Sequence, residues 1–129
     1  MVSDHSLARI LVVDDDEDIV SNLFDILTDI GYRTEVATDG NTALEMMSSR
    51  TGNGCPFDLA LIDYRLPGMD GASLIQRIHA LYPSFRAIMI TGHTADDGVQ
   101  AIRKHERLTI LQKPVDMRSL LELIDHALN

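Results

Sequence analysis

The sequence has one cysteine, Cys55, so an internal disulfide is excluded and a reducing compartment is expected. Basic residues are scarce, because eleven lysines and arginines stand against twenty acidic residues, for a formal net charge of −9. Nucleic acids and anionic membranes attract cationic surfaces, so neither is expected as a direct partner. No apolar run is long enough to cross a bilayer, and residues 1–9 lack the apolar stretch of a signal peptide. These absences predict an acidic, cytoplasmic protein.

Several catalytic motifs are also missing. The sequence contains no GxxxxGK[ST] phosphate-binding loop and no GxSxG turn, so nucleotide hydrolysis and serine-hydrolase chemistry have no support. The histidines do not have the spacing of a transition-metal site. They are His5, His79, His93, His105 and His126. The abundant carboxylates are therefore the groups to examine for chemistry.

The 129 residues are enough for one domain, which we expect over 1–129 with its core in about 8–128. Runs rich in β-branched residues alternate with segments in which apolar residues recur at helical spacing. The predicted strands are 8–13, 32–37, 58–62, 86–91 and 108–111, and the predicted helices are 17–30, 41–49, 71–81, 95–105 and 115–128. Parallel strands need crossover connections, so this alternation predicts an α/β fold: a doubly wound, five-stranded parallel sheet with five helices on its two faces.

The segment from Phe57 to Gly71, FDLALIDYRLPGMDG, is the centre of the sequence. Its apolar strand stops on Asp63, and a turn follows at Pro67 and Gly68, since proline presets its φ and glycine tolerates positive φ. Asp70 is placed to cap the next helix. We therefore expect Asp63 at the carboxyl end of its strand, which is where open α/β sheets bind ligands.

Polar residues also follow or end three other predicted strands. Asp14 and Asp15 follow the first strand, Thr91 ends the fourth and Lys113 comes just after the fifth. Taken singly, these residues are typical helix caps, turn formers or a solvated lysine. The carboxyl ends of parallel strands share one edge of a sheet, however, so all of them are expected to converge on Asp63. Four coincident strand ends favour one common site.

Crowded carboxylates repel each other, so a site of this composition needs protons or a cation. Mg²⁺ or Mn²⁺, which bind oxygen ligands, are the natural occupants, and such an ion attracts phosphoryl groups. Lys113 adds a positive charge and Thr91 can donate a hydrogen bond. An ionised carboxylate is itself a nucleophile. Asp63 is the best nucleophile candidate because it stands alone at its strand end, whereas Asp14 and Asp15 are typical of an ion-binding pair.

Four segments together resemble the receiver domain of the response regulators of two-component signalling, with a chemotaxis-regulator-like fold. They are ILVVDDD at 10–16, LIDYRLPGMDG at 61–71, MITG at 89–92 and QKP at 112–114. The resemblance covers nearly the whole chain and implies a flavodoxin-like sheet of strand order 2-1-3-4-5. It also implies that the bond before Pro114 is cis.

The resemblance implies a function as well. Asp63 would accept a phosphoryl group from a phosphohistidine on a sensor histidine kinase or a phosphotransfer protein, and the resulting change of conformation would control a downstream protein in a two-component system or phosphorelay. The chain would catalyse only its own phosphorylation and dephosphorylation, with no external substrate. Thr91 and Lys113 would bind the phosphoryl oxygens. Mg²⁺ would be held by Asp14 or Asp15, by Asp63 and by the backbone carbonyl of Arg65.

The chain departs from the family pattern at Ile110, where many receivers have a tyrosine or phenylalanine that swings inward on activation. We expect a weaker or different response around the fourth helix and fifth strand. Arg65 and His93, two residues after Asp63 and Thr91, occupy positions that flank the attacking water in this family. We expect both to modulate the lifetime of the aspartyl phosphate.

Two other readings stay open from the residues alone. The chain could be a receiver-like interaction module that takes no phosphate and acts by docking, a reading that Ile110 slightly favours. It could also be a phosphatase of the haloacid dehalogenase kind, which uses an aspartyl nucleophile. That chemistry needs a second acid two residues after the nucleophile, and Arg65 stands there instead.

Overall fold

The computed structural model describes residues 8–48, 54–92 and 107–128. Five parallel strands form one sheet in the order β2-β1-β3-β4-β5, which confirms the predicted topology. The strands are β1 (Arg9–Val13), β2 (Arg33–Ala37), β3 (Leu59–Asp63), β4 (Arg86–Thr91) and β5 (Leu108–Gln112). Four helices are described: α1 (Glu17–Ile30), α2 (Gly40–Ser48), α3 (Gly71–Leu81) and α5 (Met117–Leu128). The helix predicted over 95–105 lies outside the described residues.

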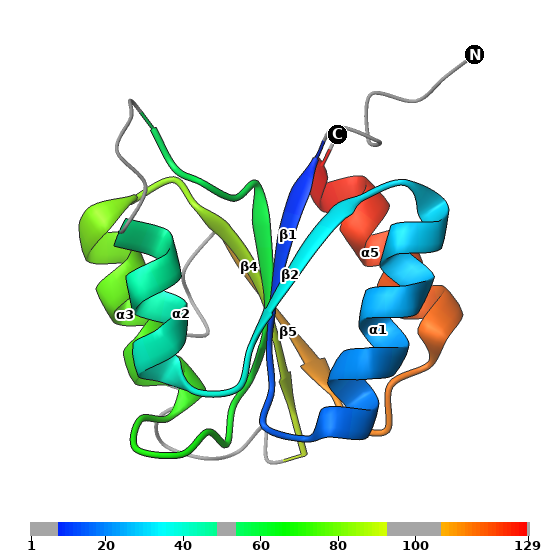
Figure 1. Cartoon of the computed structure of the whole chain (residues 1–129), viewed down its shortest axis with the longest axis horizontal. Helices are drawn as coiled ribbons and strands as arrows, with labels where there is room; N and C mark the ends of the chain where they lie inside the picture. The colour runs from blue at the N-terminus through cyan, green and yellow to red at the C-terminus, as the bar shows by residue number, and fades with distance from the viewer. Residues whose placement is uncertain (1–7, 49–53, 93–106, 129) are drawn as a thin grey trace.

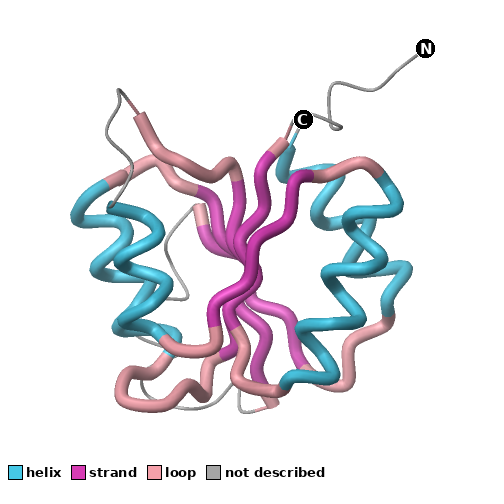
Figure 2. The backbone as a smooth tube through the Cα atoms, viewed as in Figure 1, coloured by secondary structure: helices cyan, strands magenta, loops and turns pink. Residues whose placement is uncertain are grey.

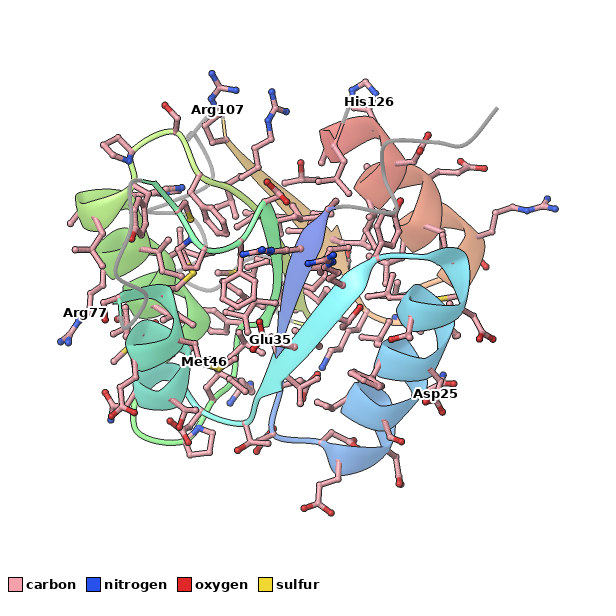
Figure 3. The ribbon with its side chains drawn as sticks, turned by 45° about the horizontal axis from the view of Figure 1, so that its top comes forward. Asp25, Glu35, Met46, Arg77, Arg107 and His126 are labelled. Carbon is pink, nitrogen blue, oxygen red and sulfur yellow. The ribbon has the colours of Figure 1, made fainter. Side chains whose placement is uncertain are left out.

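The helices cover the sheet on both sides. Figure 1 shows α1 and α5 together on one face and α2 and α3 on the other, and the tube in Figure 2 shows the same three layers. Every strand runs in the same direction, so the carboxyl ends of β1, β3, β4 and β5 lie along one edge of the sheet. Exposed charged side chains such as Arg77 and Asp25 point outward from this sandwich (Figure 3).

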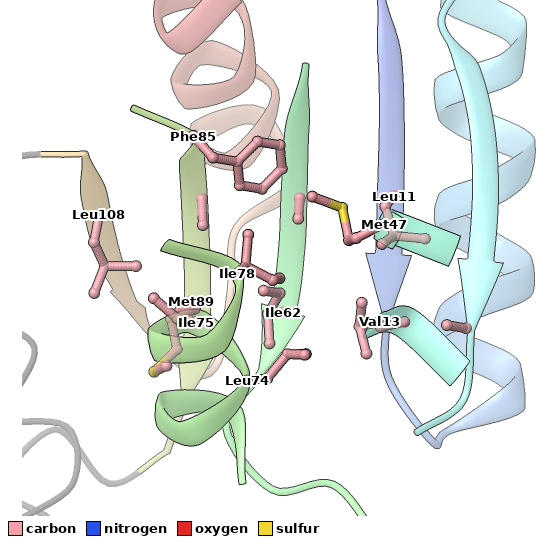
Figure 4. Close-up of a cluster of buried hydrophobic side chains, with 14 of the residues drawn as sticks. Leu11, Val13, Met47, Ile62, Leu74, Ile75, Ile78, Phe85, Met89 and Leu108 are labelled. Atoms are coloured by element: carbon pink, nitrogen blue, oxygen red, sulfur yellow. The ribbon is translucent and has the colours of Figure 1, made fainter. Parts of the chain in front are cut away.

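Each face of the sheet has its own apolar core. Leu27, Leu120 and Ile124 pack from α1 and α5 onto one face, and Met47, Leu74 and other residues of α2 and α3 pack onto the opposite face (Figure 4). The central strand β3 is buried along its whole length, as expected for a strand between two helical layers. None of the described helices has the length and apolar character that a membrane span requires.

Local signals position the helix ends. The side chain of Asp16 accepts hydrogen bonds from Asp18 N and Ile19 N and so caps the start of α1. Gly31 ends α1 with a φ of 119°, in the left-handed region that glycine adopts without strain. Asp70 caps α3 by accepting a hydrogen bond from Ser73 N, as predicted.

Several boundaries differ from the prediction by one or two residues. The strand predicted from residue 8 begins at Arg9, the helix predicted over 41–49 spans Gly40–Ser48, and the strand predicted to end at residue 111 ends at Gln112. The strand predicted over 58–62 runs one residue later and includes Asp63. The helix predicted from residue 115 begins at Met117, because the side chain of Asp116 accepts the Ser119 N–H at 3.2 Å and acts as its cap. The strand predicted from residue 32 begins at Arg33. Val36 of this strand is 37% exposed, because β2 is an edge strand with one neighbour.

Candidate functional site

The carboxyl ends of the strands bring the predicted residues to one edge of the sheet. Asp63 is the last residue of β3 and is 7% exposed, Asp14 directly follows β1 and is also 7% exposed, and Thr91 ends β4 at 2%. The backbone joins two of these ends directly, because Lys113 N donates a hydrogen bond to Thr91 O at 2.8 Å. Four distant segments of the sequence therefore converge here through the parallel register alone.

Lys113 and Asp63 form an ion pair across this edge. The Nζ atom of Lys113 lies 2.7 Å from Oδ1 of Asp63, with the lysine side chain 39% exposed and the aspartate side chain 8% exposed. Burial by itself lowers the pKa of the Lys113 ammonium, but the hydrogen bond and charge of Asp63, helped by Asp14 and Asp16, raise that pKa above its ordinary value. Lys113 is therefore held as a cation at the site.

Three carboxylates meet beside this lysine. One oxygen from each of Asp14, Asp15 and Asp63 lies within 4.8 Å of the others, with Asp14 and Asp63 buried and Asp15 exposed. Burial raises the pKa of Asp14, and the charges of Asp63 and Asp15 raise it further, while the Asp16 N–H and the Lys113 charge act in the opposite direction. The net shift is upward. This cluster of carboxylate oxygens fits a hard divalent cation, which would relieve the repulsion.

The capping alternative for Asp14 and Asp15 is wrong. The first helix is capped by Asp16, and Oδ1 of Asp14 accepts a hydrogen bond from Asp16 N at 3.0 Å. That bond orients the carboxylate of Asp14 within the cluster. The run of acids therefore divides its roles, with Asp14 and Asp15 in the cluster and Asp16 at the helix cap.

The turn after β3 holds Asp63 through a contact that the sequence did not reveal. Gly71 N donates to Tyr64 O at 2.6 Å, and Gly68 has a φ of 77°, as its place in the turn predicted. A Cβ atom at Gly71 would lie 2.7 Å from the backbone oxygen of Asp63 and 2.9 Å from Cα of Tyr64. The start of α3 therefore packs directly against the backbone of Asp63, and only glycine allows that approach.

The remaining predicted residues are placed less directly. Arg65 is exposed two residues after Asp63, and its proposed metal contact and modulating role stay predictions. His93 lies outside the described residues. Ile110 is half-buried and packs against the core on the α2–α3 side. The bond between Lys113 and Pro114 is cis, as the resemblance implied.

A cavity of about 540 Å³ adjoins the site between α1 and α5. Asp14 and Lys113 line it at the site, and apolar side chains line most of the rest. The apolar residues include Ile19, Leu23, Ile90, Val115, Met117 and Leu120. No local pattern indicated this cavity, because its walls come from three separate segments of the sequence, 14–23, residue 90 and 113–120.

Comparisons with known proteins agree with this geometry. The family model of the response regulator receiver domain matches residues 10–125. A response regulator receiver protein of Anaeromyxobacter sp. (strain Fw109-5) is 37% identical over 117 residues, which make up 91% of this chain and 47% of that protein. Sporulation initiation phosphotransferase F of Bacillus subtilis (strain 168) is 29% identical over 116 residues, which make up 90% of each chain.

A solved structure shows the same fold. The receiver domain (CheY-like) of Methanospirillum hungatei JF-1 superposes with a TM-score of 0.83 at 34% sequence identity, covering 95% of this chain and 94% of that one. The chain thus spans about half the length of its Anaeromyxobacter relative and nearly all of the solved receiver domain. Fold, site and sequence agree: the chain belongs to the receiver domains of the response regulators in two-component signalling.

Proposed function

We propose that Asp63 is the phosphoacceptor of this receiver domain. The observation that carries the proposal is the 2.7 Å ion pair between Asp63 and Lys113 beside the carboxylates of Asp14 and Asp15. The ammonium of Lys113 lies against the carboxylate of Asp63, so the nucleophile stands next to a positive charge that can stabilise phosphoryl oxygens. No other described acid combines burial, a cation partner and a strand-end position.

The reaction transfers a phosphoryl group from a phosphohistidine to Asp63. A carboxylate oxygen of Asp63 attacks phosphorus, an O–P bond forms and the P–N bond to the histidine breaks, and the departing imidazole takes up a proton. Lys113 stabilises the phosphoryl oxygens through its ammonium. Thr91, which ends β4 at the same edge, stabilises them through its hydroxyl. Water later hydrolyses the aspartyl phosphate, and Arg65 and His93 modulate that rate.

The residues present fit a divalent cation. Asp14, Asp15 and Asp63 would hold Mg²⁺ or Mn²⁺, together with the backbone carbonyl of Arg65. When bound, the ion supplies charge neutralisation for the transferring phosphoryl group. Asp14 is the strongest argument for a cation here. It is buried and its pKa is raised, so a bound cation would stabilise its ionised form.

The donor is a sensor histidine kinase or a histidine phosphotransfer protein, and the output is a conformational change that controls another protein. We infer a single domain over 1–129, which acts in the cytoplasm on no external substrate. The alternative is a receiver-shaped module that takes no phosphate and acts by docking. The intact set of Asp14, Asp15, Asp63, Thr91 and Lys113 argues for phosphorylation, and Ile110 is the one departure.

Intact mass after incubation with acetyl phosphate and Mg²⁺ tests the proposal. The chain is expected to gain one phosphate, and the gain is expected to disappear with a chelator or in Asp63→Asn. Asp25→Asn is the matched control, because Asp25 is an exposed acid on α1 and its loss should leave the gain unchanged. Absence of any gain, with acetyl phosphate and with a phosphohistidine donor alike, would support the docking-only module instead.

A further inference from the structure

The outer edge of β2 is open. Within the described ranges β2 pairs with β1 alone, since it is the first strand in the order β2-β1-β3-β4-β5. In Figure 1, β2 lies nearest to the viewer, and no described helix crosses its outer side. Such an edge presents backbone N–H and C=O groups with which another strand can pair.

The hydrogen bonds toward β1 show which backbone groups of β2 point outward. Arg33 N donates to the residue before β1 at 2.9 Å, and Ala37 O accepts from the residue after β1 at 3.1 Å. The backbone groups of successive residues in a strand alternate between its two sides. Arg33, Glu35 and Ala37 therefore bond toward β1, whereas the N–H and C=O groups of Thr34 and Val36 point to the open edge.

We propose that a second copy of this chain pairs antiparallel with the β2 edge, around a two-fold axis at Thr34. The outward N–H and C=O groups of Thr34 then exchange two hydrogen bonds with Thr34 of the second copy. The same register sets Arg33 opposite Glu35 of the second copy, and symmetry repeats this contact. These two positions form the non-hydrogen-bonded pair, in which opposed side chains lie closest, so their opposite charges attract.

Charge selects this register among those that the outward groups allow. An axis at Val36 would place Glu35 opposite Ala37, and the residue opposite Arg33 would be Asp39, which lies beyond the end of β2. Only the axis at Thr34 pairs both charges of the strand. Glu35 also has an interaction within its own chain, and its two carboxylate oxygens can accept further hydrogen bonds.

Two exposed apolar side chains lie where this contact would cover them. Val36, on the strand itself, is 37% exposed, and Phe24, on α1, is 40% exposed. Ile19 and Asn22 of α1 line the cavity shared with α5, so Phe24 lies on the opposite flank of the helix, toward the β2 edge. A two-fold axis perpendicular to the sheet keeps α1 of both copies on the same side of the joined sheet. The flanks that carry Phe24 then lie toward each other.

The proposed association is expected to be weak. A pair of five-residue strands buries less than an interface of standard size, and two chains of charge −9 repel each other. Dimers are therefore expected only at high protein concentration. The contact lies away from Asp63, so the proposal does not rest on phosphorylation.

Sedimentation equilibrium over about 10 μM to about 1 mM, the range for small interfaces, is the first measurement. The wild-type chain is expected to dimerise within this range. Arg33→Glu or Glu35→Arg places like charges opposite each other twice, so each change should raise the dissociation constant about tenfold or more. The double variant R33E/E35R restores opposite charges and should return the constant to within about threefold of wild type.

Matched controls separate this contact from general charge repulsion. Arg118→Glu and Glu122→Arg change the net charge equally at exposed positions of α5 and should leave the dissociation constant unchanged. Amide hydrogen exchange gives a second readout, since the Thr34 and Val36 N–H groups should gain protection as the protein concentration rises. A monomer at all concentrations, single variants no weaker than the controls, or dimers without protection at these amides would each overturn the proposal.

Discussion

At the scale of single residues, Asp14 shows what it costs to bury a carboxylate among other carboxylates. It is buried, its carboxylate accepts a hydrogen bond from Asp16 N, and it lies among other carboxylates. Its raised pKa means that the fold is less stable when Asp14 is ionised, because burial and the neighbouring acids disfavour its charge. Without a bound cation, the repulsion among these carboxylates therefore reduces the stability of the fold.

Asp14→Asn is expected to stabilise the metal-free protein at neutral pH. It removes the buried charge and keeps an oxygen for the Asp16 N–H, so the free energy of unfolding should rise by about 1 kcal/mol, the low end of the cost of a poorly paired buried polar group. Because the pKa is raised in the folded state, the destabilisation is complete above that pKa and fades as pH falls toward the ordinary value of 3.8. Urea unfolding in a chelator at several pH values measures this difference.

Asp25→Asn serves as the control, because Asp25 is exposed on α1 and should change stability little at any pH. Added Mg²⁺ should make the wild-type chain more stable than Asp14→Asn. An ion that binds only the folded state stabilises it, and Asp14→Asn has lost one of the carboxylates that would hold the ion. If Asp14→Asn were less stable than wild type in chelator at neutral pH, the electrostatic account of Asp14 would be wrong.

At the scale of elements, the junction between β3 and α3 determines where Asp63 is held. The strand ends on Asp63, the turn passes through Gly68, and α3 returns so closely that Gly71 contacts the backbone of Asp63 and Tyr64. The acid is therefore supported by its own strand and by the start of the following helix. Position in the site depends on packing between backbone segments as well as on the strand.

Gly71→Ala is expected to destabilise the protein by about 2 kcal/mol, a typical cost of adding a methyl group to a tightly packed site. The new Cβ would lie 2.7 Å from a backbone oxygen, so β3 or α3 must shift. Urea unfolding measures the loss, and the rate of phosphorylation by acetyl phosphate should fall with it because Asp63 moves.

Gly92→Ala is the matched comparison, since among the described residues no heavy atom beyond its chain neighbours lies within 4 Å of the added Cβ, and its backbone does not have the left-handed φ that favours glycine. It should change stability by less than about 1 kcal/mol. Equal losses in the two variants would show that the close approach at Gly71 does not constrain the junction.

At the scale of the whole molecule, the sheet separates two helical layers, and the site lies at the edge where the carboxyl ends of the strands meet. The cavity between α1 and α5 reaches Asp14 and Lys113 from one side, while Ile110 packs into the core of the other. An isoleucine has neither the ring nor the hydroxyl of the aromatic residue common at this position in the family. We therefore expect that the response to phosphorylation of Asp63 does not depend on an aromatic swing at β5.

A phosphoryl mimic such as beryllofluoride with Mg²⁺ is expected to give small amide shifts at 109–111 and larger shifts near Asp14, Thr91 and Lys113. Backbone NMR of the free and mimic-bound protein measures this distribution. Ile110→Tyr should increase the shifts at 109–111, and Ile110→Val, which stays apolar, should not. Large shifts concentrated at 109–111 in the wild-type chain would contradict this view.

The pattern of residues along the sequence determined much of this fold. The period of the apolar residues predicted every described strand and helix to within two residues, because a strand buries alternate or consecutive residues and a helix buries one stripe. Asp70 and Gly68 had their predicted local roles, since caps and turns depend on a few neighbouring residues. The placement of Asp63 with Asp14, Asp15, Thr91 and Lys113 followed from one rule, that parallel strands end at the same edge.

Contacts between distant segments decided the rest. The division of Asp14 to Asp16 into cluster and cap, the backbone approach at Gly71, the cavity beside Lys113 and the exposure of Val36 all arise where separate elements meet. No pattern along the chain contains them, because each depends on which strand is at the edge and how closely one helix lies against its neighbour. The sequence alone determines which residues reach the site, and only the tertiary structure decides which atoms contact there.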